Sequence, residues 1–303
     1  MRYTSWGIII DDIVFPDGRT AMRVLGGGGI YAVAGMRLWS ADVGILSNVA
    51  YDFDPAILAG LDIKHGLYRN ERTTPRAWQL FEVDGQRTQI PRNPMADWSA
   101  QLAWPDDFAE RMRGHGVSAA HMLSRGVAGN AEVLASMVAA GIRISLEPII
   151  EEGMDAAARE RVMACLPYAE IFSPGLQELR VLLGDVAPDD GVRRLAAHGP
   201  AIVALRRGAE GSLVYHRASD RLIEVPAAPV TVVDVTGGGN AYVGGLLVGW
   251  CESGDIRLAA ASASVSAALA LEQIGPPIIT PAVVQAADQR RSEMLGRLRE
   301  LNG

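Results

Sequence analysis

Residues 234–250, DVTGGGNAYVGGLLVGW, place three consecutive glycines directly before an apolar segment that reads as a helix. Glycines have no side chain to block an approaching anion, and they tolerate positive φ values that turn successive backbone N–H groups toward one point. The helix that follows adds the positive end of its dipole. Gly237, Gly238 and Gly239 therefore form a candidate site for a phosphate, although tight helix–sheet packing would explain the same glycines.

Asn240 follows these glycines, where chemistry on a hydroxyl would be helped by a proton-accepting carboxylate. A neutral amide cannot accept that proton, and general-base assistance is typically worth about 10² to 10⁴ in rate. Phosphoryl transfer depends mostly on positioning and charge stabilisation, which the rest of a site could supply. The sequence thus predicts attenuated chemistry or none, unless another group supplies the base. In a second interpretation, Asn240 is a helix-start residue, because asparagine is favoured near N-caps.

Composition narrows the classes of protein. The chain has 303 residues, of which 49% are hydrophobic and 21% charged, enough for one large globular domain or two modest ones. Its net charge of −7 and pI near 5.3 give no basic field for nucleic acid or an anionic membrane. The two cysteines lack metal-like spacing, and no apolar run is long enough for a signal peptide or a membrane span. We expect a cytoplasmic protein.

Strand and helix patterns alternate along the chain. Residues 5–15, SWGIIIDDIVF, read as a buried strand that runs into Asp11 and Asp12 at its carboxyl end, where open α/β sheets bind ligands. Further apolar strands are expected at 43–46, 117–123, 142–147, 170–173, 202–206 and 212–216. The intervening helices are expected at 131–140, 156–166 and 176–183, and the C-terminal helices at 240–251, 255–273 and 281–301. This alternation predicts a mostly parallel sheet covered by helices on both faces.

Between Tyr68 and Arg92 the alternation of strands and helices gives way to a different hydrophobic pattern. RAWQLFEVDGQRTQI, residues 76–90, alternates apolar and polar residues around Asp84–Gly85, a strong hairpin signal. A two-sided, partly polar sheet does not belong in a buried parallel core. We therefore predict one domain over residues 1–303, with a small β-sheet lid formed by segments near 13–24 and 68–92.

Several segments resemble the PfkB, or ribokinase-like, family of carbohydrate kinases. DVTGGGNAYVGGLL (234–247) is similar to the family signature D-T-x-G-A-G-D-x-F, in which the last Asp is the catalytic base. Similar in the same way are GIIIDDI (7–13), GGGGIYAVAGMRL (26–38), VDGQRT (83–88), AEIFSPGLQELRVLLG (169–184) and ALRRGAEGSLVY (204–215). The details GGGGIYA, TGGGN and ALEQIGPP look closer to a divergent branch, best known from fungi, with Asn at the base position. The resemblance implies a three-layer α/β/α sandwich with a β lid.

The resemblance also implies roles for individual residues in a transfer of the γ-phosphate of Mg-ATP to a hydroxyl of a sugar or nucleoside. Gly237–Gly239 would stabilise charge and Asn240 would occupy the base position; the acceptor would be held by Asp12, Gly27, Gly28 and Tyr31. The nucleotide would contact Arg206, Gly208 and Gly211, and Glu178 would support Mg²⁺. Two alternatives stay open: Arg206 and Arg207 as a solvated pair, and Glu178 as an ordinary exposed helix charge. A monovalent cation is a further cofactor of this scheme. Because lid strands of this family often pair between subunits, the lid residues Trp78 and Leu80 suggest a homodimer.

Three departures from the family pattern concern chemistry or recognition. Asn240 replaces the catalytic Asp, Gly175 replaces the Asn of N-x-x-E, and the Asn that follows the first glycine pair is missing. Asp12 is the one nearby alternative base that the sequence suggests, while Asp234 is expected to order the loop. An acceptor that is already deprotonated would need no base. The competing hypothesis is a catalytically silent protein that binds a nucleotide, a small ligand or a protein partner in the same cleft.

Two other classes of site fit poorly. Gly26–Gly29 suggest a dinucleotide fingerprint, but G-x-G-x-x-G requires glycine where Tyr31 stands. The five histidines show no HExxH or paired spacing, so we interpret them as structural or surface residues. Neither a Rossmann dehydrogenase nor a histidine metal centre is expected.

Overall fold

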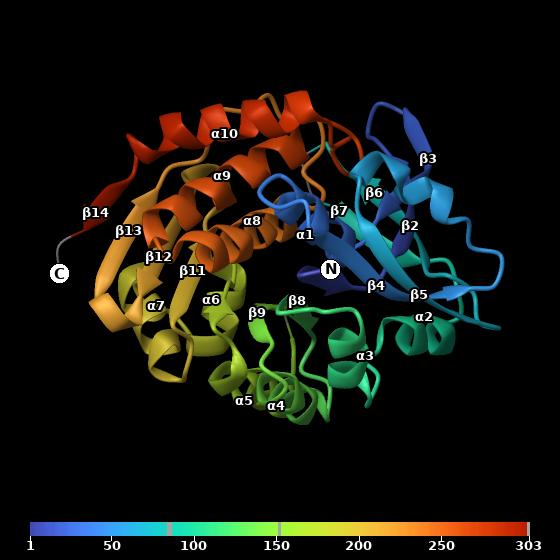
Figure 1. The fold of residues 1–303 in the computed structure, drawn as a ribbon, viewed down its shortest axis with the longest axis horizontal. Helices are drawn as coiled ribbons and strands as arrows, with labels where there is room; N and C mark the ends of the chain where they lie inside the picture. The colour runs from blue at the N-terminus through green and yellow to red at the C-terminus, as the bar shows by residue number, and fades with distance from the viewer. Residues whose placement is uncertain (84–86, 151–152, 302–303) are drawn as a thin grey trace.

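The computed structural model describes residues 1–83, 87–150 and 153–301. Its strands form a sheet of ten strands and a separate sheet of four. Figure 1 shows helices on both sides of the large sheet and the small sheet at one end of the molecule. The predicted fold class, an α/β sandwich with a mostly parallel sheet and a small β lid, is confirmed. No helix in the described ranges combines the length and apolar character needed to cross a membrane.

The large sheet is parallel over most of its width. Its strands span Tyr3–Trp6 (β1), Val43–Ala50 (β4), Lys64–Asn70 (β5), Ala119–Ser124 (β8), Arg143–Pro148 (β9), Ile171–Phe172 (β10), Ile202–Arg206 (β11), Ser212–His216 (β12), Arg221–Val225 (β13) and Arg299–Leu301 (β14). Seven of them are parallel, in the order β11-β10-β9-β8-β1-β4-β5. Beyond β11 the sheet continues with β12, β13 and β14 in antiparallel pairing. The central strands are buried on both sides because helices cover both faces.

Two helical layers bury the two faces of this sheet (Figure 1). One layer comprises α1 (Gly28–Arg37), α8 (Gly238–Ser253), α9 (Ile256–Leu271) and α10 (Pro281–Leu295). The other comprises α3 (Phe108–Gly114), α4 (Asn130–Ala139), α5 (Ala156–Cys165), α6 (Leu176–Leu183) and α7 (Pro188–Ala197). Short 3₁₀ turns occupy Pro55–Leu61, Leu166–Tyr168, Gly208–Glu210 and Arg217–Ser219. The predicted elements between residues 117 and 216 agree with these bounds to within two residues.

The lid is a four-stranded sheet in the order β3-β2-β6-β7. Its strands are β2 (Ile9–Val14), β3 (Thr20–Gly26), β6 (Arg76–Phe81) and β7 (Arg87–Pro91). The predicted buried strand through residues 5–15 is wrong as one element: β1 ends at Trp6, Gly7 adopts a φ of 95°, and β2 then belongs to the lid. The predicted lid start at Tyr68 is also wrong, because residues 68–70 pair with β4 in the large sheet. The expected turn at Asp84–Gly85 lies outside the described residues.

The C-terminus differs from the predicted single helix over 281–301. α10 ends at Leu295, and residues 299–301 form β14, which pairs with β13 at the sheet edge. The side chain of Glu300 accepts hydrogen bonds from Arg221 on β13 at 2.7 and 3.0 Å. The helical pattern therefore stops because an unpaired strand edge offers the last residues a ladder of hydrogen bonds.

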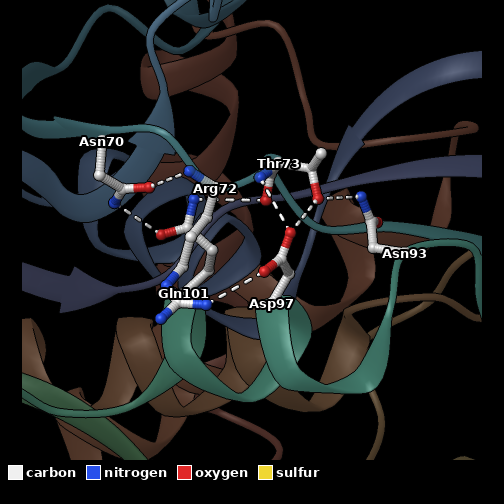
Figure 2. A network of polar contacts seen from close by, with 6 residues as sticks. All are labelled: Asn70, Arg72, Thr73, Asn93, Asp97 and Gln101. Atoms are coloured by element: carbon white, nitrogen blue, oxygen red, sulfur yellow. Dashed lines mark hydrogen bonds and ion pairs between the residues drawn. The ribbon is translucent and has the colours of Figure 1, made fainter.

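A polar network fastens the lid to the large domain where the chain crosses between them (Figure 2). Its members lie at the end of β5, in the loop before β6, after β7 and on α2 (Met95–Leu102): Asn70, Arg72, Thr73, Asn93, Asp97 and Gln101. Asp97 accepts hydrogen bonds from Arg72 Nη1 and Thr73 Oγ1, both at 3.1 Å. Asn93 Nδ2 donates to Thr73 Oγ1 at 2.7 Å. The outgoing and returning connections of the lid are thus held against the same helix.

Backbone contact between α1 and α8 fixes the two helices against each other. A Cβ atom built on Gly35 would come within 3.0 Å of the carbonyl oxygen of Ala241, and one built on Gly244 would come equally close to that of Ala32. Real Cβ atoms essentially never approach so closely. Because the crossing positions Gly35 and Gly244 have no side chains, the two helices pack with their backbones in contact. Their first turns therefore lie close together at the same end of the sheet.

Gly244→Ala is expected to destabilise the fold by about 1–3 kcal/mol, the usual cost of overpacking a core. The matched control is Gly114→Ala in α3, where no atom lies within 4 Å of the added Cβ. There the better helix propensity of alanine should stabilise the protein by up to about 1 kcal/mol. Urea unfolding measures both changes, and an unchanged or raised stability of Gly244→Ala would contradict the close packing.

Candidate active site

The glycine loop before α8 forms the floor of the candidate site. Gly237 adopts a left-handed φ of 78° as the N-cap residue, and α8 begins at Gly238. A Cβ on Gly237 would come within 3.0 Å of the ring of Tyr31, which packs against the loop. Among the described residues no side chain caps the first turn of this 16-residue helix, which leaves its first backbone N–H groups for an anion.

The first turn of α1 lies beside this loop. Gly27 is the N-cap residue of α1, with a φ of 92°, and Gly28 starts the helix. A Cβ on Gly28 would lie 3.0 Å from Nδ2 of Asn240, so the two glycine segments meet at the Asn240 amide. The structure thus brings together Gly27, Gly28, Tyr31, the three glycines of the loop and Asn240, as the sequence predicts.

Asn240 does not cap its helix. The N-cap residue is Gly237, so Asn240 lies in the first turn of α8, as a helix-start residue would, but it is not the capping residue. Its Nδ2 instead donates a hydrogen bond of 2.9 Å to Oε2 of Glu147, at the end of β9. A carboxylate can only accept hydrogen bonds, so this contact fixes which side of the amide carries nitrogen.

Glu147 belongs to a buried charged cluster behind the loop. The residue is 8% exposed, its Oε1 lies 2.7 Å from Nη1 of Arg206, and its Oε2 lies 3.5 Å from Nε2 of the fully buried His121. Burial alone would raise the pKa of Glu147, but the charge of Arg206 and the contact with His121 hold this pKa below its usual value. Glu147 is therefore a carboxylate that stays ionised at neutral pH.

Sequence reasoning missed Glu147 as a site residue. The available signal was an acid at the last position of the predicted strand 142–147, the edge at which open α/β sheets bind ligands. Its partner Arg206, predicted to bind nucleotide, also donates from Nη2 to the carbonyl of Ser173 at 3.0 Å. A Cβ on Gly239 would come within 3.0 Å of Arg206 Nη1, so this guanidinium lies directly behind the glycine loop.

Gly208 and Gly211 form the tight turn from β11 to β12, with φ values of 60° and 81°. A Cβ on Gly211 would come within 3.0 Å of the carbonyl oxygen of Val225. Packing against the strand end therefore requires glycine at position 211. The side chain of Arg206 turns away from these glycines toward Glu147 and Ser173.

The two neighbouring acids of β2 point to opposite faces of the lid, as successive strand residues must. Asp12 is fully buried, accepts a hydrogen bond from the backbone N–H of Arg23 at 2.8 Å, and pairs with Arg76 at 3.0 Å and with Arg92. These contacts occupy the carboxylate that the resemblance assigns to the acceptor.

Asp11 is the acid that faces the glycine segments. Its Oδ2 lies against Gly26, where an added Cβ would clash with it, and its Oδ1 accepts a hydrogen bond from Gln79 at 2.8 Å. Burial raises the pKa of Tyr31, and the negative charges of Asp234 and Asp11 add to this shift. The structure therefore brings Asp11, rather than Asp12, to the site.

Asp234 orders the loop that precedes the glycines, as predicted. Its Oδ1 accepts a hydrogen bond of 2.8 Å from the backbone N–H of Thr236. Asp234 is 3% exposed, and within the described residues neither its Oδ2 nor the Oγ1 of Thr236 has a hydrogen-bond partner. Two buried oxygens without donors are suited to a bound cation.

Glu178 lies in the first turn of α6, after Gly175 at the N-cap. Its Oε2 lies within 3.0 Å of the position that a Cβ on Gly175 would take, so the carboxylate fills the space left by the missing Asn. Among the residues that the structure describes, no three His, Cys, Asp or Glu side chains gather closely enough to hold a metal ion alone.

Asp11→Asn tests the electrostatics of the site. Burial raises the pKa of Asp11 from 3.8 to about 6, Asp12 and Asp234 add to the shift, and the Gln79 bond and Arg87 oppose it. Because the folded pKa exceeds the unfolded one, this group favours folding most below pH 3.8 and loses that contribution as the pH rises through about 6. At pH 8 Asp11→Asn should therefore be more stable than wild type by on the order of 2–3 kcal/mol.

The matched control is Asp17→Asn, an exposed lid carboxylate whose pKa is lowered by hydrogen bonds from the backbone and side chain of Arg19. It should give no gain at pH 8. Denaturant unfolding between pH 4 and pH 8 measures both variants. A wild-type stability that runs parallel to that of Asp11→Asn across this range would contradict the raised pKa.

Comparison with known proteins places this geometry in a family. The model of the pfkB family carbohydrate kinases matches residues 19–282. A cytidine kinase of Thermococcus kodakarensis is 24% identical over 247 residues, covering 80% of this chain and 86% of that protein. A nucleoside kinase of Methanothermobacter thermautotrophicus is 24% identical over 286 residues, covering 90% and 88%.

Solved structures share the fold. A candidate ribokinase II from Escherichia coli, solved with ATP and Mg²⁺, aligns with a TM-score of 0.78 at 18% identity, over 95% of this chain and 99% of that one. The family match covers most of the chain, from just before β3 to the first turn of α10, and β2, which carries Asp11, precedes it. With its two converging glycine segments and matching order of elements, the chain belongs to the pfkB family of carbohydrate kinases.

Proposed function

We propose that the protein transfers the γ-phosphate of ATP to a hydroxyl of a small sugar-containing acceptor in the cleft between the lid and the first turns of α1 and α8. The observation that carries this proposal is the meeting of Gly28 with Asn240, which joins two helix N-termini at one point. Two helix dipoles and their free N–H groups favour the negative charge of a phosphate. The glycine turn of residues 208–211 would border the nucleotide.

In the proposed step, the acceptor oxygen forms a bond to the γ-phosphorus while the bond to the β–γ bridging oxygen breaks and ADP leaves. The N–H groups of Gly237–Gly239 stabilise the charge that develops on the transferred group. Asn240 accepts a hydrogen bond from the acceptor hydroxyl through Oδ1 but cannot take its proton. That proton passes to the transferred phosphoryl group or to water, so we expect catalysis slower by about 10² to 10⁴ than with a carboxylate base.

We assign the acceptor contact to Asp11 rather than Asp12. Asp11 lies against Gly26, at the start of the first glycine segment, whereas three donors already surround Asp12. A buried carboxylate with a pKa near 6 gains most from hydroxyl donors that satisfy it when an acceptor binds. Hydroxyl groups of a ribose ring supply donors of this kind.

Two cations fit the proposed site. Mg²⁺ would neutralise charge on the ATP phosphates, with Glu178 ordering its water shell from the start of α6. A monovalent cation would be held by the unpartnered oxygens of Asp234 and Thr236, next to the glycine loop. The likeness in fold to a protein solved with ATP and Mg²⁺ supports the first assignment.

The lid also supports a proposed homodimer. Trp78 and Leu80 alternate with the buried Ala77 and Gln79 on β6, so they lie on the face of the lid that points away from the cleft. Ile90, paired with Trp78 on β7, is 43% exposed on the same face. Sedimentation velocity should give a dimer for the wild type and a monomer for Leu80→Asp; a monomeric wild type would refute this assembly.

The proposed activity is tested by ADP formation from Mg-ATP with cytidine, D-ribose or D-fructose as the acceptor. Wild type should turn over at least one acceptor, and Gly239→Ala should lose about 10²-fold because its methyl group disturbs the N–H groups of the loop. Gly114→Ala, remote from the loop, should match wild type.

A different outcome would favour the competing hypothesis, a catalytically silent protein, over the kinase. Titration calorimetry that detects ATP binding, together with no ADP formed above the rate without acceptor, would favour a protein that uses the same cleft for binding alone. A protein that binds neither ATP nor an acceptor would contradict both functions.

A further inference from the structure

Asn240 and Glu147 form a coupled pair at the point where the two glycine segments meet. Glu147 comes from β9 and Asn240 from α8, 93 residues apart in sequence, and their side chains are joined by the 2.9 Å hydrogen bond from Nδ2 to Oε2. Glu147 is 8% exposed and Asn240 is half-buried. Water therefore screens a charge at position 240 less than it would on the surface.

Among the residues that the structure describes, one arginine compensates the charge of Glu147. Nη1 of Arg206 pairs with Glu147 at 2.7 Å, and its Nη2 donates to the carbonyl of Ser173. The second ion-pair partner of Glu147 within the described residues is His121, whose Nε2 lies 3.5 Å from the same Oε2 that accepts from Asn240. An aspartate at position 240 would bring a second carboxylate to within hydrogen-bond distance of the first.

We propose that Glu147 is a positioning residue that makes asparagine, rather than aspartate, the side chain suited to position 240. Two carboxylates at this distance cannot both ionise freely, whereas an amide donates to Glu147 and turns Oδ1 away from it. Since Nδ2 lies beside Gly28, the orientation of the amide is set where α1 meets α8. In the proposed kinase reaction, on which this role rests, the oriented Oδ1 holds the acceptor hydroxyl.

This pairing changes what restoration of the missing base requires. Asn240→Asp alone supplies a carboxylate that Glu147 keeps largely protonated, because a like charge raises its pKa. Asn240→Asp combined with Glu147→Gln keeps one carboxylate and one amide in the pair but exchanges their positions. The double variant should therefore carry an ionised base beside the glycine loop, with a neutral donor behind it.

The test compares wild type, Asn240→Asp, Glu147→Gln and the double variant. Urea unfolding at pH 7 should show that Asn240→Asp lowers the unfolding midpoint and that adding Glu147→Gln recovers part of the loss. Asn130→Asp is the matched control: Asn130 starts α4, is half-buried and contacts Ser124 rather than a carboxylate. It should not lower the midpoint, because a negative charge is favourable in a first helical turn.

A second readout is ADP formation with cytidine at pH 6 to 9. At pH 7 the double variant should exceed Asn240→Asp in kcat by about tenfold or more, with a smaller change in KM, and the gap should close as the pH rises. Glu147→Gln alone should lower kcat. The glutamine amide at position 147 can both accept and donate hydrogen bonds, so it does not fix the orientation of the Asn240 amide as a carboxylate does. A merely structural pair would lower all rates through stability and leave the pH profiles unchanged.

The outcomes separate this inference from the proposed function. Additive unfolding midpoints, or Asn240→Asp that is as stable as wild type and as active as the double variant, would overturn the role of Glu147. Coupled midpoints without turnover by any of the four proteins would instead leave the pair intact and refute the kinase activity.

Discussion

The whole site depends on the contact between two helix backbones. Gly35 and Gly244 allow α1 and α8 to meet without intervening side chains, so that the N-terminal turns of both helices reach the same end of the sheet. A side chain at either crossing would separate the glycine segments that meet at Asn240. The same residues therefore control core packing and the geometry of anion binding, so a packing fault at Gly35 or Gly244 should change the site.

Charge is distributed around this site in an unusual way for phosphoryl transfer. The base position holds a neutral amide. Behind it lies the buried, ionised Glu147, whose negative charge is compensated by its ion pair with Arg206. On the lid side, Asp11 is buried with one side-chain donor, Gln79, and its raised pKa marks a group that is poorly satisfied in the absence of an acceptor. The protein thus has a buried carboxylate on the lid and another behind the glycine loop, without a carboxylate at position 240.

Most of the fold could be predicted from sequence because periodicity and glycine signals are local. β11, β12 and α6 have the predicted bounds, and the glycine loop before α8 lies where its spacing indicates. The wrong strand predictions arise from long-range pairing. Asp11 and Asp12 look like the end of a buried strand, but the chain turns at Gly7, and both residues then pair with β6 in the lid. Likewise the hydrogen bond between Glu147 and Asn240 joins segments far apart in the sequence, so no local pattern could predict that the Asn240 amide donates to a buried carboxylate.

The most direct test of this account is a crystal structure with Mg²⁺ and a non-hydrolysable ATP analogue. The γ-phosphate should accept hydrogen bonds from the backbone N–H groups of Gly237–Gly239, with Nδ2 of Asn240 still donating to Glu147 and Oδ1 facing the acceptor side. A nucleotide bound away from this loop, or an Asn240 amide released from Glu147 to contact the phosphate through Nδ2, would contradict it.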